Sequence, residues 1–259
     1  MLNKEPERLP AGGPFRGIFH VSGVCADRRP GVSGVSEIPD RDGNPVDLAP
    51  VRAVIFDVDG TLYHQRPVRI RMACRLAGFF LLHPLRIREL LGIRHFRKLR
   101  ETERYRKTSV EEQIRAAAEK AGIRDPERLR EAVQRWMFTE PLSAIAACAD
   151  EKTLALLRQA QAEGRKILIY SDYAPEEKLA ALKVRADAVY YPGREGIDEL
   201  KPSGKCMRRI LDAQGLSPAE TVYIGDREDR DGASADSAGV RYVPVQGLRG
   251  KRPRGTKKK

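Results

Sequence analysis

The chain has 259 residues, of which 41% are apolar, and a formal net charge of +12. This length suits one or two domains, and the composition is ordinary for a globular protein. Its apolar stretches fall well short of the roughly 20 residues that cross a bilayer, and none follows the first basic residues as in a signal peptide. We therefore expect a cytoplasmic protein. The four cysteines lie far apart and are predicted to be free thiols.

The positive charge is distributed unevenly along the chain. Residues 1–50 carry a net charge of −1, whereas residues 248–259 carry +7. Residues 62–109 contain 13 Lys/Arg against three Asp/Glu, a balance of +10. Basic character indicates an anionic partner only where it clusters. The sequence thus predicts a mildly acidic body with a basic insert and a basic tail.

Residues 1–50 contain no recognisable element. They include seven Gly and seven Pro, with no sustained period of 2 or 3.6 residues. This composition is typical of a disordered leader, so we expect no regular structure there. The first predicted strand, residues 52–58, is almost entirely apolar, as are strands of a parallel sheet that is buried on both faces.

Two carboxylates follow this strand, in the run Asp57-Val58-Asp59-Gly60-Thr61. Phosphoryl transfer to a carboxylate needs one carboxylate that attacks phosphorus. It also needs an acid that protonates the departing oxygen and later deprotonates water. Asp57 and Asp59 suit these two roles. The plainer alternative is a turn with two solvated aspartates, and the apolar run before it and Thr-Leu after it argue against that alternative.

A long helical segment interrupts the alternation of strands and helices. About 85 residues separate the first strand from the helix predicted to begin at Asp150, far more than a strand-to-helix loop contains. Ser109 and Glu112 have capping-box spacing. Helices are predicted over residues 67–82, 84–105, 109–120 and 125–138. We therefore predict a helical cap, residues 65–145, inserted after the first strand.

Four further apolar runs predict the rest of the sheet, at residues 166–170, 188–191, 221–224 and 241–245. Alternation of such strands with helices predicts an α/β fold with a doubly wound, mainly parallel sheet. Ligands of such sheets bind at the carboxyl ends of the strands. The predicted catalytic core comprises residues 51–64 and 146–247. Residues 248–259, with one apolar side chain, are predicted to form a basic disordered tail.

Polar residues occur at or after three later strand ends. Ser171 and Asp172 end the second strand, where a hydroxyl and backbone N–H groups can bind phosphoryl oxygens. Lys201 offers a fixed positive charge for the transferring phosphoryl group. Asp226 ends the fourth strand, where Mg²⁺ would find the oxygen ligands it prefers. Asp231 is a better candidate than Asp229 for a partner that acts through water or from behind the direct ligands. Singly, each of these is more often an ordinary turn residue; their order along the chain strengthens all of them.

This order resembles the haloacid dehalogenase superfamily, whose motifs are Asp-x-Asp-Gly-Thr, a Ser or Thr, a Lys, and a Gly-Asp with a further Asp. The match covers about residues 51–247, and the insertion resembles the helical C1 cap class. The resemblance implies that Asp57 is the nucleophile and that Asp59 is the acid–base residue, with a backbone carbonyl on the metal. It also implies that the residues at the Mg²⁺ site are Asp57, Asp59, Asp226 and Asp231. The residues that it implies for phosphate binding are Thr61, Ser171, Asp172 and Lys201.

The second aspartate also separates branches of this superfamily, because its dehalogenases and ion-pumping ATPases lack an Asp at the position of Asp59. The resemblance therefore implies a phosphatase acting on a small phosphorylated metabolite, with a phosphomutase or phosphotransferase as the alternative. Phosphoglycolate-type members often have Asp-Ser just after the first motif, where this chain has Tyr-His-Gln-Arg. The candidate substrate contacts in the cap are His64, Arg66 and Arg69.

Two hypotheses of other classes remain, and either can coexist with catalysis. The basic cap and tail are compatible with nucleic-acid binding, although no reader motif accompanies them. Residues 73–93 are compatible with an anionic membrane surface, with arginines outward and with Phe79, Phe80, Leu81 and Leu82 inserted. The simpler explanation of that stretch is a helix pair packed within the cap. The sequence leaves the oligomeric state open.

Overall fold

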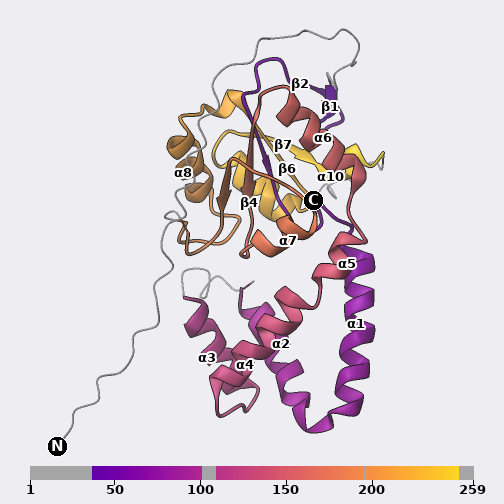
Figure 1. Ribbon diagram of the computed structural model, residues 1–259. Coiled ribbons are helices and arrows are strands. Elements are labelled where there is room, and N and C mark those ends of the chain that lie inside the picture. Colours follow the sequence, from indigo (N-terminus) through magenta and orange to yellow (C-terminus); the bar gives the residue numbers. More distant parts are fainter. Residues whose placement is uncertain (1–36, 101–108, 195–196, 251–259) are drawn as a thin grey trace, which may run out of the picture. The chain divides into compact units, whose positions relative to one another are not determined.

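A five-stranded parallel sheet organises the chain in the computed structural model, which describes residues 37–100, 109–194 and 197–250 (Figure 1). The strand order is β5-β4-β3-β6-β7, and each neighbouring pair is parallel. The strands are β3 (Ala53–Phe56), β4 (Lys166–Tyr170), β5 (Ala188–Tyr190), β6 (Thr221–Gly225) and β7 (Arg241–Pro244). The central strand is the first in sequence, so the chain winds outward in both directions from β3. This confirms the predicted doubly wound α/β fold.

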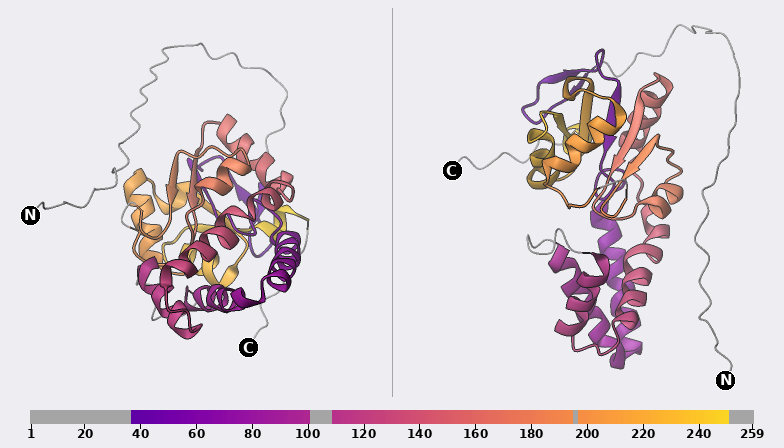
Figure 2. Two further views of the ribbon diagram at one scale, coloured as in Figure 1. Left: turned by 60° about the horizontal axis from the view of Figure 1, so that its bottom comes forward. Right: turned by 90° about the vertical axis from the view of Figure 1, so that its left-hand side faces the viewer.

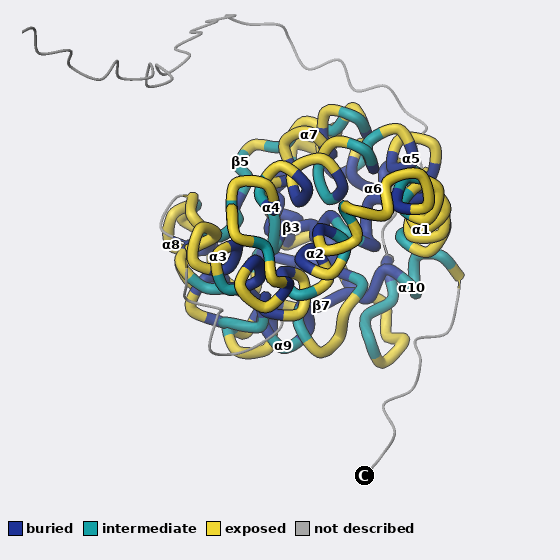
Figure 3. The backbone as a smooth tube through the Cα atoms, turned by 90° about the horizontal axis from the view of Figure 1, so that it is seen from below, coloured by how far each residue is buried: buried dark blue, intermediate teal, exposed yellow. Residues whose placement is uncertain are grey.

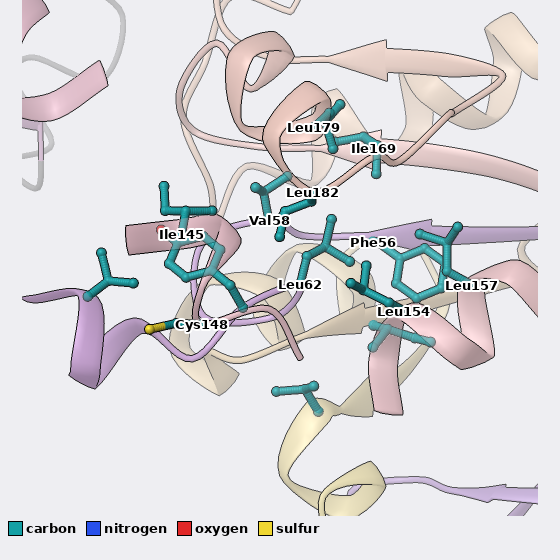
Figure 4. Packing of buried hydrophobic residues seen from close by; sticks show 14 of the residues in the cluster. Phe56, Val58, Leu62, Ile145, Cys148, Leu154, Leu157, Ile169, Leu179 and Leu182 are labelled. Atoms are coloured by element: carbon teal, nitrogen blue, oxygen red, sulfur yellow. The ribbon is translucent and has the colours of Figure 1, made fainter. Parts of the chain in front are cut away.

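Helices cover both faces of the sheet, as the right-hand view of Figure 2 shows. The packing follows the period of two in β3: Val54 and Phe56 point into one hydrophobic cluster, and Ala53 and Ile55 into the other. The first cluster includes Leu154 and Leu157, which lie beside Phe56 in Figure 4. The α-helices that follow the helical insertion and accompany the sheet are α6 (Glu151–Ala162), α7 (Glu176–Ala181), α8 (Gly204–Gln214), α9 (Ala233–Asp236) and α10 (Val245–Leu248).

Residues between β3 and α6 form a helical insertion, defined here as residues 65–146. Its elements are α1 (Gln65–Leu82), a 3₁₀ turn (Pro84–Arg86), α2 (Ile87–Arg100), α3 (Val110–Lys120), α4 (Pro126–Val133), a π-helical turn (Gln134–Thr139) and α5 (Leu142–Ala146). Ser109 caps α3 in the predicted capping box with Glu112. The helix predicted over residues 125–138 is α-helical only in its first part. Residues 101–105 of another predicted helix lie outside the described residues.

The two ends of the helical insertion meet at its junction with the sheet. Tyr63 and Ala149 form an antiparallel bridge, and the His64 N–H donates to the Cys148 carbonyl at 2.8 Å. The insertion therefore leaves and re-enters the sheet through two adjacent, hydrogen-bonded segments.

Part of the leader predicted to have no structure is ordered. Within residues 37–50, β1 (Glu37–Pro39) and β2 (Pro45–Asp47) pair as an antiparallel hairpin. Ile38, Val46 and Leu48 are buried in the same cluster as Phe56. The prediction was wrong here because strands of three residues are too short to show a period of two, and the flanking Pro and Gly residues are typical of turns. The remainder of the predicted leader, residues 1–36, lies outside the described residues.

The start of the predicted tail also contacts the sheet domain. Leu248 ends α10, and the Arg249 guanidinium forms an ion pair with Asp150 and donates to the Gly60 carbonyl at 2.8 Å. Asp150 is buried, and its other carboxylate oxygen caps α6 by accepting from the Thr153 N–H at 3.2 Å. Residues 251–259 of the predicted tail lie outside the described residues.

Arg249→Ala should therefore lower the free energy of unfolding, by about 1–3 kcal/mol, because it leaves the buried Asp150 carboxylate without its charged partner. Arg158→Ala is a matched control, since Arg158 pairs with Glu151 of the same helix but both side chains are more than 60% exposed. Exposed ion pairs contribute little. Urea unfolding of the two variants checks this prediction. Equal unfolding midpoints for Arg249→Ala and Arg158→Ala would contradict a stabilising role for Arg249.

The described cysteines, Cys74, Cys148 and Cys206, are free thiols, as predicted. Among the described helices, none combines the length and the hydropathy that a membrane span requires.

Candidate active site

The predicted site residues meet at the carboxyl ends of β3, β4 and β6. Asp57 follows β3, Ser171 follows β4 and Asp226 follows β6. Parallel strands that lie side by side end at the same edge of the sheet, so residues far apart in sequence become neighbours there. β3 lies between β4 and β6, which places Asp57 at the centre.

Donors hold both oxygens of the Asp57 carboxylate. The Lys201 ammonium donates to Oδ1 at 2.7 Å, and the Thr61 hydroxyl donates to Oδ2 at 3.1 Å. All three side chains are buried. Lys201 also donates to Asp231 Oδ1 at 2.9 Å, so one cation connects two of the acidic residues. A carboxylate held by two donors in this way has a fixed orientation.

Three carboxylates gather around this point. Oxygens of Asp57, Asp226 and Asp231 all lie within 4.8 Å of one another. Asp231 is further held by the Tyr223 hydroxyl at 2.8 Å and by the Arg227 N–H at 3.1 Å. Asp229, by contrast, is exposed and paired with Arg227, which agrees with the predicted preference for Asp231.

Gly60 allows this close approach. Its φ is +96°, and a Cβ at this position would lie 2.2 Å from Asp226 Oδ2. Both the backbone conformation and the space therefore require glycine. The turn after β3 can thus pass directly beside the Asp226 carboxylate.

Asp59 has its own set of partners. The Lys178 ammonium of α7 donates to its two oxygens at 2.6 and 2.8 Å, and the Tyr63 hydroxyl donates to Oδ1 at 2.5 Å. Burial alone would raise the pKa of Asp59, but Lys178 and Tyr63 together outweigh it and lower this pKa. The described geometry therefore favours the ionised form of Asp59.

We refer to Asp57, Asp226 and Asp231 as the acidic cluster. Within it, the pKa values of Asp57 and Asp226 are raised, whereas that of Asp59 is lowered. Burial, followed by the charges of Asp231 and Asp226, raises the pKa of Asp57 well above its usual range, although Lys201 acts against this. Burial and the Asp231 carboxylate raise the pKa of Asp226 to about 7. The Lys201 pKa is raised by Asp231 and Asp57 despite burial. Carboxylates held this close need additional positive charge when all are ionised.

A cavity of about 390 Å³ opens beside these residues. Asp57, Asp59, Asp226 and Asp231 line it together with apolar residues of the helical insertion such as Met72, Leu76 and Trp136. Five arginines of the described residues also line the cavity: Arg69, Arg97, Arg100, Arg227 and Arg230. Acidic residues of the sheet edge and arginines, three of them from the insertion, thus border one space.

The structure places some predicted residues away from this cavity or gives their side chains other partners. His64 and Arg66 are exposed and are not among the residues that line it. The Thr61 hydroxyl is bonded to Asp57. The Asp172 carboxylate accepts from the Lys201 N–H at 3.0 Å and from Arg230 at 2.7 Å. The Ser171 hydroxyl is buried and accepts from the Tyr173 N–H at 3.3 Å. Phosphate binding by Thr61, Ser171 and Asp172 remains a prediction.

Sequence reasoning missed several residues that contact the acidic groups or their neighbours, among them Lys178, Tyr223 and Arg100. Lys178 holds Asp59, Tyr223 holds Asp231, and Arg100 donates to the Asp172 carbonyl at 2.6 Å. Lys178 sits in a charged Glu-Glu-Lys run that resembles any solvated helix face. Tyr223 lies inside an apolar strand, where an aromatic residue is ordinary. Their roles depend on tertiary neighbours, and nothing in the local sequence distinguishes them.

Comparison with known proteins agrees with this geometry. Residues 51–239 match the family model of haloacid dehalogenase-like hydrolases. A phosphoserine phosphatase from Thermus thermophilus is 32% identical over 145 residues, which cover 54% of this chain. The match spans about half of that relative, 55% of its length.

Solved structures share the fold at low identity. A 2-haloacid dehalogenase from Pseudomonas syringae pv. tomato DC3000 aligns with a TM-score of 0.53 and 16% identity, covering 75% of this chain and 86% of that one. The HAD-hydrolase YfnB from Bacillus subtilis, solved bound to magnesium, has the same TM-score and identity, with coverage of 74% and 87%. Because the family model matches well over half of the sequence and the strand ends bring its motif residues together, the chain belongs to the haloacid dehalogenase-like hydrolase family.

Proposed function

We propose that this protein is a Mg²⁺-dependent phosphatase that hydrolyses a small phosphomonoester through a phosphorylated Asp57. One observation carries the proposal. The Asp57 carboxylate is fixed by Lys201 and Thr61, lies within 4.8 Å of Asp226 and Asp231 oxygens, and has a second carboxylate, Asp59, two residues away. This combination provides a nucleophile, a metal-ligand set and an acid–base group at one point.

The acidic cluster fits a magnesium ion. Mg²⁺ prefers carboxylate oxygens and usually keeps several of its waters, and the turn at Gly60 keeps the space beside Asp226 free of a side chain. Asp57, Asp226 and Asp231 would hold the ion, with the Asp59 backbone carbonyl. When bound, Mg²⁺ would offset the charge of these carboxylates and of the phosphoryl group.

The residues then divide the reaction into two steps. In the first, an Asp57 oxygen forms a bond to phosphorus, the ester P–O bond breaks, and the departing oxygen takes a proton from Asp59. In the second, Asp59 takes a proton from water, which attacks phosphorus and breaks the bond to Asp57, releasing inorganic phosphate. Lys201 stabilises the charge that develops beside Asp57 in both steps. The ionised Asp59 that Lys178 favours is the form needed for the second step.

Phosphatase chemistry is further supported by the Thermus thermophilus relative, which is a phosphoserine phosphatase. We propose a small phosphorylated metabolite as substrate, because the cavity of about 390 Å³ is of the size that holds a small molecule.

The direct test is phosphate release from a panel of phosphomonoesters, phosphoserine included, with and without Mg²⁺. The proposal requires Mg²⁺-dependent release of inorganic phosphate with at least one ester, and loss of that release in Asp57→Asn. Phosphate retained on an isomer of the substrate, or moved to another acceptor, would instead indicate a phosphomutase or phosphotransferase.

The raised pKa of Asp226 predicts a pH-dependent stability in the absence of metal. A carboxyl whose pKa is about 7 in the folded state and about 3.8 when unfolded binds a proton only in the folded state between these values. Its contribution is fully present below about pH 3.8 and is lost progressively as the pH rises to about 7. In EDTA, the Tm should therefore fall between about pH 4 and pH 7 and level off above pH 7, and Mg²⁺ should reduce that fall.

Asp226→Asn is the control for this measurement, because it removes the titrating group while keeping its shape. The variant should show a smaller change of Tm with pH in EDTA and a weaker response to Mg²⁺. If its Tm changes with pH and Mg²⁺ as the wild type does, Asp226 is neither the titrating group nor a metal ligand.

We also propose that the helical insertion acts as a cap whose arginines attract the anionic substrate. Arg69 and Arg66 are both exposed on α1, but only Arg69 lines the cavity. Arg69→Ala should lower kcat/KM at low ionic strength, by roughly tenfold, and the loss should shrink as salt screens the wild-type attraction. Arg66→Ala is the matched control and should stay near wild type. Equal behaviour of the two variants at every salt concentration would refute steering by Arg69.

A further inference from the structure

Large apolar side chains are exposed where α1 turns into α2. Leu81, Leu82 and Leu85 have relative exposures of 82%, 78% and 93%. Ile87 and Leu91, one helical turn apart on α2, are 46% and 44% exposed. Single exposed leucines are common in proteins, but several within one short stretch of chain form a patch that calls for a partner. We refer to Leu81, Leu82, Leu85, Ile87 and Leu91 as the apolar tip.

The neighbouring aromatic residues do not share this exposure. Phe80 is buried, and the Phe79 ring packs edge-on against Trp136 with 5.1 Å between ring centroids. The hypothesis that residues 73–93 insert Phe79 and Phe80 into a membrane is therefore wrong for these two side chains, which hold α1 against the π-helical turn. Leu81 and Leu82 remain exposed, at the end of a helix that Figure 3 shows mostly in the exposed colour.

The charged residues on α1 and α2, the two helices that flank the apolar tip, are almost all basic. Residues 65–100 contain ten Lys/Arg and a single carboxylate, Glu89. Glu89 is only 1% exposed and accepts from both Arg86 and Arg128 at 2.8 Å. The helices α1 and α2 thus present no exposed carboxylate. Arg88 is exposed within the tip, and Arg86, half-buried, lies over the Phe79 ring.

We propose that the apolar tip docks this protein onto the surface of an anionic lipid bilayer. Leucines that emerge at a helix turn can enter the boundary between head groups and acyl chains, while nearby arginines remain at the phosphate groups. One guanidinium group can bind two phosphate oxygens at once, and each basic residue near an anionic surface adds to the attraction. The docking is peripheral, and it is independent of the function proposed above.

Charge complementarity favours this occupant over two others. A second copy of the chain would bring the same arginines face to face across a two-fold interface, so like charges would repel. The N-terminal segment of residues 1–36 contains five Lys/Arg and three Asp/Glu, so it offers no excess negative charge to match the tip. An anionic membrane supplies both an apolar layer and a dense negative surface.

The test is cosedimentation of the full-length protein with vesicles of phosphatidylcholine alone or mixed with phosphatidylglycerol. Wild type should bind the phosphatidylglycerol vesicles and bind phosphatidylcholine vesicles much less. The combined variant Leu81→Ser, Leu82→Ser and Leu85→Ser keeps every charge and should lose at least about tenfold in vesicle affinity. Its Tm and its phosphatase activity on a soluble ester should match wild type, since the three side chains are exposed.

Val110→Ser is the matched control, because Val110 is 42% exposed on α3, outside the apolar tip, and its variant should bind vesicles as wild type does. Three results would each overturn the proposal. The first is a wild type that shows no preference for anionic vesicles. The second is a leucine variant that binds as tightly as wild type, which would assign binding to charge alone. The third is a wild-type dimer in solution that the leucine variant dissociates, which would make the tip a protein interface.

Discussion

Asp57→Asn should lower kcat by roughly four orders of magnitude or more, with no loss of folding stability. The amide keeps the size of the carboxylate. Its carbonyl oxygen can still accept from Lys201 and its NH₂ group can donate to the Thr61 hydroxyl, but it cannot attack phosphorus. Stability should not fall in the absence of metal, because the folded protein raises the pKa of Asp57 and so disfavours its ionised form. The measured kcat should therefore fall, whereas the Tm in EDTA should not.

The two readouts separate loss of the nucleophile from general damage to the site. Phosphate release near the wild-type rate by a folded Asp57→Asn protein would exclude Asp57 as the nucleophile. Lys201→Met is the contrasting variant, because it leaves Asp57 and Asp231 buried without the cation that both contact. It should lose activity and stability together.

Asp59→Asn should lower the rate by about 10²–10⁴-fold on alkyl phosphates, whose departing oxygen needs a proton. The loss in the first step should be smaller with p-nitrophenyl phosphate, since its leaving group departs without protonation. Burst measurements that separate the first step from the second would show this difference. An equal loss on both esters in the first step would contradict the acid role of Asp59.

Lys178→Met provides a second measurement on the same carboxylate. Removing the ammonium that contacts both Asp59 oxygens should raise the pKa of Asp59, because Lys178 is the main group that lowers it. Protonated Asp59 would then persist to higher pH. In the pH profile of the rate on alkyl phosphates, the alkaline limb should therefore move to higher pH. An unmoved profile would show that Asp59 titration does not limit the reaction.

The sequence by itself was sufficient for the fold class and for the expectation that certain polar residues gather at one edge of the sheet; their catalytic roles remain predictions. Strands buried on both faces appear as apolar runs, so the five strands of the sheet could be located from hydrophobicity alone. In a parallel sheet the strand ends fall on one edge, so the order of Asp57, Ser171, Lys201 and Asp226 predicted a shared site. The preference for Asp231 over Asp229 also agrees with the structure, which places only Asp231 in the acidic cluster.

Short or irregular elements were beyond sequence reasoning. The β1–β2 hairpin lacks enough residues to show a period, and its stability comes from burying Ile38 and Val46 against distant parts of the chain. Arg249, at the start of a basic run, gives no local sign that it reaches Asp150, 99 residues earlier. Tertiary contacts of this kind are decided by which surfaces pack together.

Tertiary structure alone decided which charged residues serve the site and which face solvent. Arg66 and Arg69 are three residues apart on one helix, yet only Arg69 lines the cavity. Lys178 is one of three charged residues in a row and is the one that is buried against Asp59. A sequence specifies charge and helical periodicity, but the direction in which a helix presents each side chain depends on its packing against neighbouring elements. For this chain, the sequence determined the chemistry of the sheet edge, and the packing of α1 and α7 determined which cations meet it.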